Sequence, residues 1–469
     1  MKTKQESISR PERAKRRLSK HLEQINLYAA GIDVGSERHY VSVPEGLDDN
    51  PVRSFSCFTG DLECLADWLV EIGIQSVVME STGVYWIPVF EILEERGLLV
   101  LLVDARRVKH VAGRKTDVLD CQWLQQLHTY GLLEGAFRPP EQICALRAYL
   151  RQRDNLIRQL ATHVQHIQKA LRQMNLLLDN VITDITGATG MKIIRAIVAG
   201  ERDPRRLAKH RDPRCKSSEE IIVKSLEGHY RDEHLFALQQ AVELYDIFQD
   251  KIHACDGAIE QHLGTFEPRA DPQDLPRGTK RRKKQGNAAL FDVRAHLYRI
   301  SGVDLTRIEG IDESTALKVI SEIGIDMSRW KTEKHFASWL GLSPGSKISG
   351  GKVINSRSKR SANRAAAALR MAAFAVSNSK SAVGAYYRRL RARLGAPKAI
   401  TATAHKLARI LYSMLKHGTE YVEQGQEHYE QQYRERVLKN IRRRAADLGY
   451  SLVQNGTEGP TAANVLSMT

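Results

Sequence analysis

The sequence lacks the segments that would place it in a membrane or an oxidising compartment. No apolar run reaches the roughly 18 residues that a membrane-spanning helix needs. The first 20 residues hold eight Lys/Arg and two Glu but no apolar core, so we expect no secretory signal there. Six cysteines are scattered over 469 residues without a CxxC pair, which argues against a disulfide framework and a zinc site. We therefore expect a cytoplasmic protein without a membrane partner, built from roughly two to four domains.

Acidic residues are missing from one long stretch, 334–419, which contains 17 Lys/Arg. The whole chain has 71 Lys/Arg and 55 Asp/Glu, a net charge of +16, so this stretch accounts for the entire excess. A solvated surface usually mixes both signs of charge. The acid-free stretch therefore favours contact with nucleic-acid phosphates over a role in solubility alone.

Residues 28–135 alternate between strand and helix patterns, after a basic and flexible arm over 1–27. The expected strands are 28–34, 39–43, 52–58, 76–79 and 98–103, and the expected helices are 62–72 and 89–96. Three meandering strands followed by βαβ units predict an α/β domain with a mixed sheet flanked by helices.

Residues 140–266 are expected to form long helices of the coiled-coil type. Eleven positions from 143 to 178 step by three and four, and ten of them are apolar, with Arg153 as the interruption. Such a seam supercoils against a partner helix. The partner could be 233–263 of the same chain or a second copy, and the sequence leaves both open. The role of the insertion at 181–232 is not readable from its residues.

The C-terminal part is predicted as a basic linker over 267–290, an all-α domain over 296–420 and a flexible tail over 440–469. The linker contains KRRKK at 280–284, which is either a solvated run or a nucleic-acid contact. The helical domain opens with RIEGIDESTALKVISEIG, two helical stretches around a glycine turn. Helix-hairpin-helix turns that bind phosphate commonly read Gly-x-Gly. Here Asp312 replaces the second glycine after Gly310, so phosphate binding and simple helix packing are both open.

Four carboxylates stand at the ends of predicted elements. Asp33 ends the first strand in GIDVGS, and Glu80 follows a buried strand in MESTGVYW. Asp117 and Asp120, in KTDVLDCQWL, are three apart on a predicted helix and share one face. Each alone could cap a turn or a helix. Together they would repel one another unless a cation joined them, and carboxylate oxygens suit Mg²⁺ or Mn²⁺.

The motifs GIDVG, MESTGVYW, KTDVLDCQWL and the C-terminal GLSPGSKISGGK, in this order, resemble the DEDD transposases of bacterial insertion sequences. These are the bridge-RNA-guided recombinases, and the resemblance covers about 30–130 and 300–420. It implies a RuvC-like (RNase H-like) N-terminal domain in which Asp33, Glu80, Asp117 and Asp120 are the catalytic tetrad that binds the metal. It also implies donor and target DNA, a guide (bridge) RNA, a homodimer or homotetramer, and association with the bacterial nucleoid.

The resemblance also singles out Ser349 as the catalytic nucleophile. From chemistry alone a serine among glycines is ordinary loop, and Ser343, Ser346, Ser356, Ser358 and Ser361 would be equal candidates. The resemblance implies that the serine forms a covalent bond to DNA in a site shared with the tetrad. The basic residues around it are expected to bind nucleic acid: Lys347, Lys352, Arg357, Lys359, Arg360 and Arg364.

Two other functions fit the same residues. A RuvC-like structure-specific nuclease would use water as its nucleophile and would not need Ser349. A non-catalytic nucleic-acid-binding protein with a degenerate site would bind equally well without Asp33 or Glu80. Loss of a serine–DNA adduct in Ser349→Ala would separate the first hypothesis from both.

Overall fold

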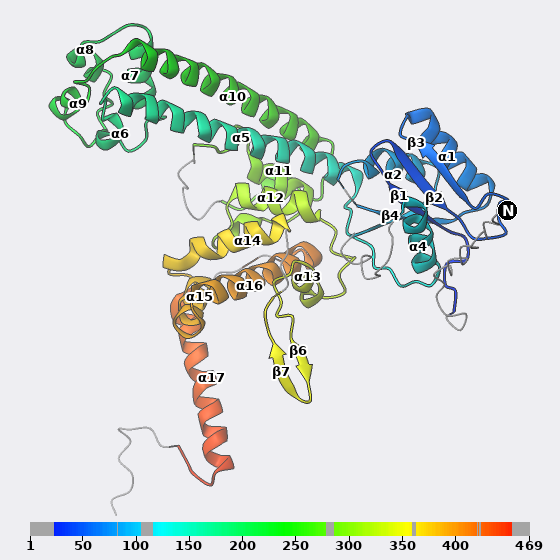
Figure 1. Cartoon of the computed structure of the whole chain (residues 1–469). Helices are drawn as coiled ribbons and strands as arrows, with labels where there is room; N and C mark the ends of the chain where they lie inside the picture. Colours follow the sequence, from blue (N-terminus) through cyan, green and yellow to red (C-terminus); the bar gives the residue numbers. More distant parts are fainter. Residues whose placement is uncertain are drawn as a thin grey trace, which may run out of the picture. The chain divides into compact units, whose positions relative to one another are not determined.

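The computed structural model describes residues 23–81, 83–104, 116–277, 286–358, 363–419, 421 and 424–452 (Figure 1). The chain forms two compact units, Met1–Arg138 and Pro139–Thr469, and each is described by itself. None of the described helices has the length and hydrophobicity to cross a membrane.

The first unit is built on a five-stranded sheet in the order β3-β2-β1-β4-β5. Its strands are β1 (Ala29–Val34), β2 (Arg38–Ser42), β3 (Val52–Ser56), β4 (Ser76–Glu80) and β5 (Leu99–Val103). The first three strands pair antiparallel, whereas β1, β4 and β5 run parallel. The expected mixed sheet is confirmed, and it is consistent with an RNase H-like start of the chain.

Helices cover both faces of this sheet because alternate side chains of each strand point to opposite sides. Helices α1 (Thr59–Glu71) and α2 (Trp86–Glu95) pack on a core that includes Ile32 and Met79. Helix α4 (Asp117–Thr129) covers the other face, where Leu124 packs with Val78 and Val103. The last residues of the predicted N-terminal arm belong to this unit, because the amides of Ile25 and Asn26 both donate to the carbonyl of Thr129.

The heptad seam forms a helical hairpin within the chain, so the structure favours the first of the two predicted partners. Helix α5 (Glu141–Gln173) lies antiparallel to α10 (Asp232–Gly264) (Figure 1). The seam itself ends at Met174, because Asn175 has a positive φ of 59° that stops the helix. Arg153 interrupts the apolar pattern because its guanidinium pairs with buried Asp256 of α10 at 2.5 Å.

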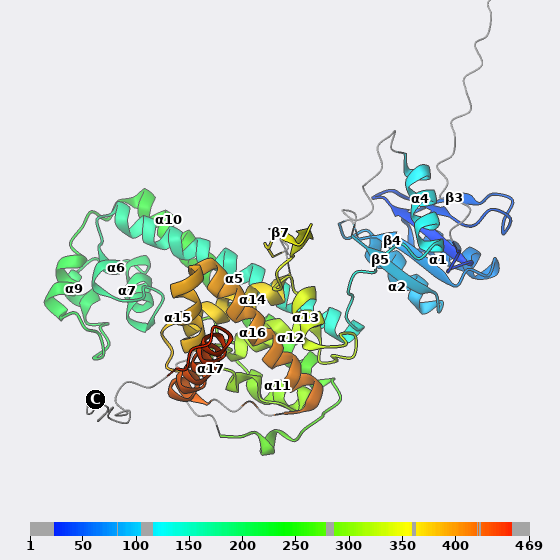
Figure 2. The same cartoon turned by 90° about the horizontal axis from the view of Figure 1, so that it is seen from below.

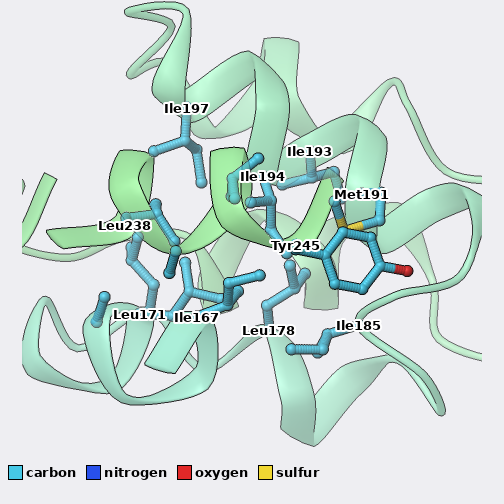
Figure 3. Packing of buried hydrophobic residues seen from close by; sticks show 14 of the residues in the cluster. Ile167, Leu171, Leu178, Ile185, Met191, Ile193, Ile194, Ile197, Leu238 and Tyr245 are labelled. Atoms are coloured by element: carbon cyan, nitrogen blue, oxygen red, sulfur yellow. The ribbon is translucent and has the colours of Figure 1, made fainter. Parts of the chain in front are cut away.

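The insertion folds as a small helical cap on the far end of the hairpin. It contains α6 (Leu178–Val181), α7 (Ala188–Val198), α8 (Pro204–Ala208) and α9 (Glu219–Ser225). Figure 3 shows Ile193 and Ile197 of α7 packed with Ile167 of α5 and Leu238 of α10. The cap therefore extends the hairpin core.

The remainder of the second unit is mostly helical. Its elements are the 3-10 turns η1 (Pro272–Asp274), η2 (Leu305–Arg307) and η3 (Val376–Asn378), and the helices α11 (Val293–Ser301), α12 (Glu313–Ile323), α13 (Glu333–Trp339), α14 (Arg364–Ala375), α15 (Ala382–Leu394), α16 (Ala396–His417) and α17 (Gly425–Asp447) (Figures 1 and 2).

The predicted C-terminal domain is mostly helical, with one exception: β6 (Lys347–Ser349) and β7 (Lys352–Asn355) form a hairpin. The predicted flexible tail from 440 is helical as far as Asp447, where α17 ends. The run 280–284 lies outside the described residues.

The turn at Gly310 is a packing element. Its φ is +90°, and a Cβ at this position would lie 2.5 Å from Cγ1 of Val376 and 2.7 Å from the carbonyl oxygen of Ala372. The carboxylate of Asp312 accepts a hydrogen bond from the amide of Thr315 and caps α12. Since neighbouring backbone already fills the space beside the glycine, the structure favours helix packing over phosphate binding at this turn.

Candidate active site

Two of the four predicted carboxylates lie side by side at one edge of the sheet. Asp33 is the fifth residue of β1, and Glu80 is the last residue of β4. The two strands pair in parallel with Ile32 opposite Met79, so the next residues in register are Asp33 and Glu80. Neighbouring strands are about 4.8 Å apart. Both residues are partly exposed, and both have interactions within the structure.

Both carboxylates point to the face that α4 covers. Gly31 contacts the backbone of α4, and its partner Val78 packs with Leu124 of that helix. Two residues further along each strand, Asp33 and Glu80 share this face because side chains alternate. The end of β4 is fixed by Ser81, whose amide and hydroxyl both donate to the carbonyl of Val103.

The direction of α4 brings the other two carboxylates to the same edge. At its C-terminal end, the ring of His128 lies 3.0 Å from the hydroxyl of Ser76, at the start of β4. The helix therefore runs antiparallel to β1 and β4, and its first turn, with Asp117 and Asp120, lies over the strand ends. All four predicted members of the tetrad thus belong to one edge and one face of the sheet.

The close approach of α4 to β1 depends on a glycine. A Cβ on Gly31 would lie 2.4 Å from the amide nitrogen of Gln125 and 2.5 Å from the carbonyl oxygen of Cys121. Real Cβ atoms do not come so close to backbone, so only glycine permits this helix position. Its residue type therefore sets the height of the tetrad's helix above the sheet.

The first turn of α4 is capped by Thr116, whose hydroxyl accepts a hydrogen bond from the amide of Leu119. The partial positive charge of a helix N-terminus stabilises nearby carboxylates. The negative charge in this region also acts on buried Cys121. Burial, with added repulsion from Asp33 and Asp120, raises the pKa of its thiol to about 12. Cys121 therefore stays protonated, and Asp33 and Asp120 both lie close enough to affect its pKa.

The donor set suits a hard divalent cation. Carboxylate oxygens are the preferred ligands of Mg²⁺ and Mn²⁺, which keep several waters and leave room for substrate phosphates. Over the described residues, no group of three or more Asp, Glu, His or Cys side chains is arranged to hold a metal ion. The three elements that carry the four carboxylates, β1, β4 and α4, are therefore neighbours without forming a complete protein cage. That is compatible with a cation that is bound partly by water and substrate.

Ser349 lies in the β6–β7 hairpin, not in the loop that the sequence predicted. It pairs with Lys352 across a two-residue turn in which Gly350 and Gly351 have φ values of 55° and 75°. Two positive φ values are the signature of a type I′ turn, whose twist matches that of the strands. Ser349 is exposed, as are Ile348 and Val353 beside it. The hydroxyl thus lies at the tip of a short exposed ribbon.

The predicted basic residues are partly within the described structure. Lys352 faces Ser349 across the turn, and the amide of Arg357 is held by the side chain of Asn355. Arg364 begins α14, and all three basic residues are exposed. Lys359, Arg360 and the side chain of Lys347 lie outside the described residues.

One carboxylate at the sheet edge was missed by sequence reasoning. Asp104 directly follows β5, the strand beside β4, and it is exposed. The same signal that identified Glu80, an acid immediately after a buried apolar strand, was available in LLVD. Asp104 lies at the same sheet edge as the tetrad, although the alternation from Val103 points it away from α4.

The chain is similar to known transposases in both units. A family model of the IS110 DEDD type, described as "Transposase", matches residues 30–176, and one described as "Transposase IS116/IS110/IS902 family" matches residues 304–388. The first match contains all four carboxylates, and the second contains Ser349.

One curated relative is the uncharacterized 43.6 kDa protein of insertion element IS110 from Streptomyces coelicolor (strain ATCC BAA-471 / A3(2) / M145). It is 35% identical over 122 residues, which cover 25% of this chain and 29% of the relative. The chain thus aligns with less than a third of that relative's length.

Proposed function

Because the chain belongs to the IS110 family of DEDD transposases, we propose that it cleaves and rejoins DNA as a transposase or recombinase. The observation that supports this most is that Asp33 and Glu80 end neighbouring strands at the sheet edge toward which the first turn of α4, with Asp117 and Asp120, is directed. Acids directed toward one sheet edge have little structural use, since like charges repel. Binding a divalent cation together with a nucleic-acid phosphate would give these acids a function.

We propose that these four residues hold Mg²⁺ or Mn²⁺ and that Ser349 supplies the nucleophile. When bound, the metal would neutralise charge on the phosphate and activate oxygen nucleophiles or leaving groups. The second unit contributes the serine and positive charge. Lys352, directly across the turn from Ser349, is placed to stabilise the negative charge that develops on the phosphate.

The proposed chemistry conserves the energy of the DNA bond. The Oγ of Ser349 loses its proton and bonds to phosphorus, while the bond from phosphorus to a sugar oxygen breaks and that oxygen takes up a proton. The reverse reaction with another sugar oxygen restores the DNA backbone and frees the serine. Rejoining therefore requires no ATP, and one difficult step becomes two easier ones.

The finer partners also belong to the proposal. From the family resemblance we expect a guide (bridge) RNA that pairs with donor and target DNA. We also expect a homodimer or homotetramer that acts at the bacterial nucleoid. The acid-free stretch 334–419 supplies positive charge for such partners. The helical hairpin uses its seam within the chain, so an oligomer would have to form through other surfaces.

The experiment is a covalent-adduct assay with the full chain, end-labelled DNA, Mg²⁺ and the RNA that co-purifies with the protein. We expect a protein–DNA adduct that resists denaturation. Ser349→Ala should abolish it, whereas Ser346→Ala, a nearby exposed serine, should leave it unchanged. Asp33→Asn and Glu80→Gln should abolish cleavage while DNA binding persists.

Two other outcomes would assign a different function. Strand breaks without an adduct, undiminished in Ser349→Ala, would mean a RuvC-like nuclease that uses water. If the protein binds DNA but cleaves it with none of the divalent metal ions tested, and if Asp33→Asn does not change that binding, the protein is a non-catalytic nucleic-acid-binding protein. Sequencing the co-purified RNA tests the guide separately, since a population of unrelated cellular RNA would argue against one.

A further inference from the structure

Helix α17 (Gly425–Asp447) has two halves with different surroundings. Its first turns are anchored on α15. The guanidinium of Arg388 donates to the side chain of Gln426 at 2.7 Å, and the guanidinium of Arg389 lies 3.1 Å from the ring centre of Tyr433. Arg389 also donates to the hydroxyl of Tyr429 at 3.2 Å. This half is therefore fixed to the domain by polar and aromatic contacts.

The second half of α17 extends away from α15 (Figure 1). Nothing in the helix is buried, and from 436 to 446 it contains no acidic residue. The basic residues of this half are Arg436, Lys439, Arg442, Arg443 and Arg444. At about 100° per residue they spread over one broad side of the helix, while Val437, Ile441 and Ala445 follow one another four apart on the other side.

Such an arrangement costs stability when the helix is alone in water. Lys439 and Arg443 are four apart, a spacing at which like charges destabilise a helix. A helix that only needed to be soluble would mix the two signs of charge along its length. In α17 the first half instead holds Glu427, Glu430 and Glu435 with the single basic residue Arg434, and the change from mainly acidic to basic charge coincides with the point where the helix leaves the domain.

We propose that the basic half of α17 (436–447) binds the phosphate backbone of duplex DNA. A helix of about 10–12 Å diameter with no buried residue can lie along a backbone or in the major groove of DNA, about 12 Å wide. The phosphates supply the opposite charge that the sequence of this half lacks. The choice of nucleic acid as the polyanion rests on the proposed function.

The anchor connects this surface to the body of the domain. Burial raises the pKa of Tyr429, and the positive charges of Arg389 and Arg436 oppose that rise, so both cations lie near its hydroxyl. Arg389 of α15 and Arg436 of α17 therefore bring positive charge from the two helices close to one hydroxyl. Helix α17 also lies beyond the region 304–388 that matches the family model, so the inference concerns a part of the chain that the comparison does not cover.

The test measures binding by the full chain to a labelled 30-base-pair DNA and to an RNA hairpin of equal charge, over a range of salt. In Arg442→Gln/Arg443→Gln/Arg444→Gln we expect binding to fall roughly tenfold to a hundredfold. The slope of log K against log salt on DNA should fall by up to about 2.7, which is about 0.9 for each phosphate that the variant no longer neutralises. Glutamine is as good a helix former as arginine, so the helix should persist.

Two matched variants make the outcome decisive. Lys169→Gln/Lys224→Gln/Lys251→Gln removes the same charge from exposed positions elsewhere in the second unit and should leave both probes bound as before. Replacing the three α17 arginines by lysine keeps the charge and should retain binding and slope. A loss of DNA binding supports the inference, whereas a loss confined to the RNA hairpin would overturn it and assign the helix to RNA. Binding within twofold of the parent and an unchanged slope on both probes would overturn the inference.

Failure of this inference is distinguishable from failure of the proposed function. If the glutamine variant binds normally while Asp33→Asn abolishes cleavage, α17 has no such role and the transposase proposal stands. If the parent protein never cleaves DNA but the glutamine variant binds it less tightly, α17 binds nucleic acid and the catalytic proposal fails.

Discussion

Replacing Gly31 by alanine tests whether the position of α4 over the sheet creates the active site. The new Cβ would lie 2.4 Å from the amide nitrogen of Gln125, and ordinary van der Waals contact begins at 3.4 Å. The helix and strand must therefore separate by about 1 Å. The neighbouring atoms belong to backbone, so no side chain can turn aside to make room. Gly31 lies in a buried strand without a positive φ, so crowding is the only cost of the change.

This displacement has a catalytic and a stability consequence. A misplacement of about 1 Å can reduce a reaction rate roughly a hundredfold, and here it acts on the helix that carries Asp117 and Asp120. Overpacking of this kind typically destabilises a fold by about 1–3 kcal/mol. We therefore expect cleavage by Gly31→Ala to fall by about two orders of magnitude, and the α4 amides to exchange hydrogen faster.

The assay compares the rate of DNA strand cleavage with hydrogen exchange in the full chain. Gly60→Ala is the matched control, because it adds the same methyl group in the same unit where nothing lies within 4 Å. Gly60→Ala should keep full cleavage and normal exchange at α4. The reasoning is refuted if Gly31→Ala cleaves DNA within twofold of the parent, since the tetrad would then tolerate a displaced helix.

Three further predictions concern the second unit. Asp256→Asn should destabilise the helical hairpin by about 3–5 kcal/mol in urea unfolding, because it leaves the charge of Arg153 buried without its carboxylate partner. Replacing both residues by leucine should destabilise it far less, and equal losses of stability in the two variants would contradict this reasoning. Gly310→Ala should cost roughly 2–4 kcal/mol of stability but leave the salt slope of DNA binding unchanged, because this turn packs on protein. A reduced slope would mean that the turn binds phosphate after all. Burial raises the pKa of Asp304, but hydrogen bonds from Arg294 and Thr306 outweigh it and hold the pKa below its ordinary value. The stability that this ion pair gives should therefore be present at neutral pH and be lost as the pH falls through the lowered pKa. Asp304→Asn should show no such acid-dependent loss in a pH series of thermal unfolding.

The sheet of the first unit was predictable almost residue by residue. Its strands are short apolar runs between turn residues, a pattern that depends only on local sequence. For the same reason, the local sequence was enough to identify Asp33 and Glu80 at the ends of strands. The depth at which α4 packs was not predictable, because Gly31 reads as an ordinary glycine until a helix from 90 residues later lies on it.

The errors in the second unit have different causes. A loop was predicted at Ser349, although two glycines between short β-branched segments are typical of a type I′ hairpin turn. The glycines were interpreted as space for a phosphate beside the serine and not as turn residues. Helix α17 was missed because its high proportion of polar and charged residues resembles disorder, yet its Glu, Gln, Arg and Ala content favours helix. The role of Arg153 depends on Asp256, 103 residues away.

The separation of charge along the chain follows from the proposed chemistry. A site made of four carboxylates repels DNA, so the phosphate to be cut can remain there only if other groups hold the nucleic acid and a cation offsets the local charge. The first unit provides the acids, and the acid-free stretch 334–419 with the basic half of α17 provides the opposing charge. Because the excess positive charge lies on a different part of the polypeptide, the basic residues can hold the phosphates of the nucleic acid while the acids hold a cation.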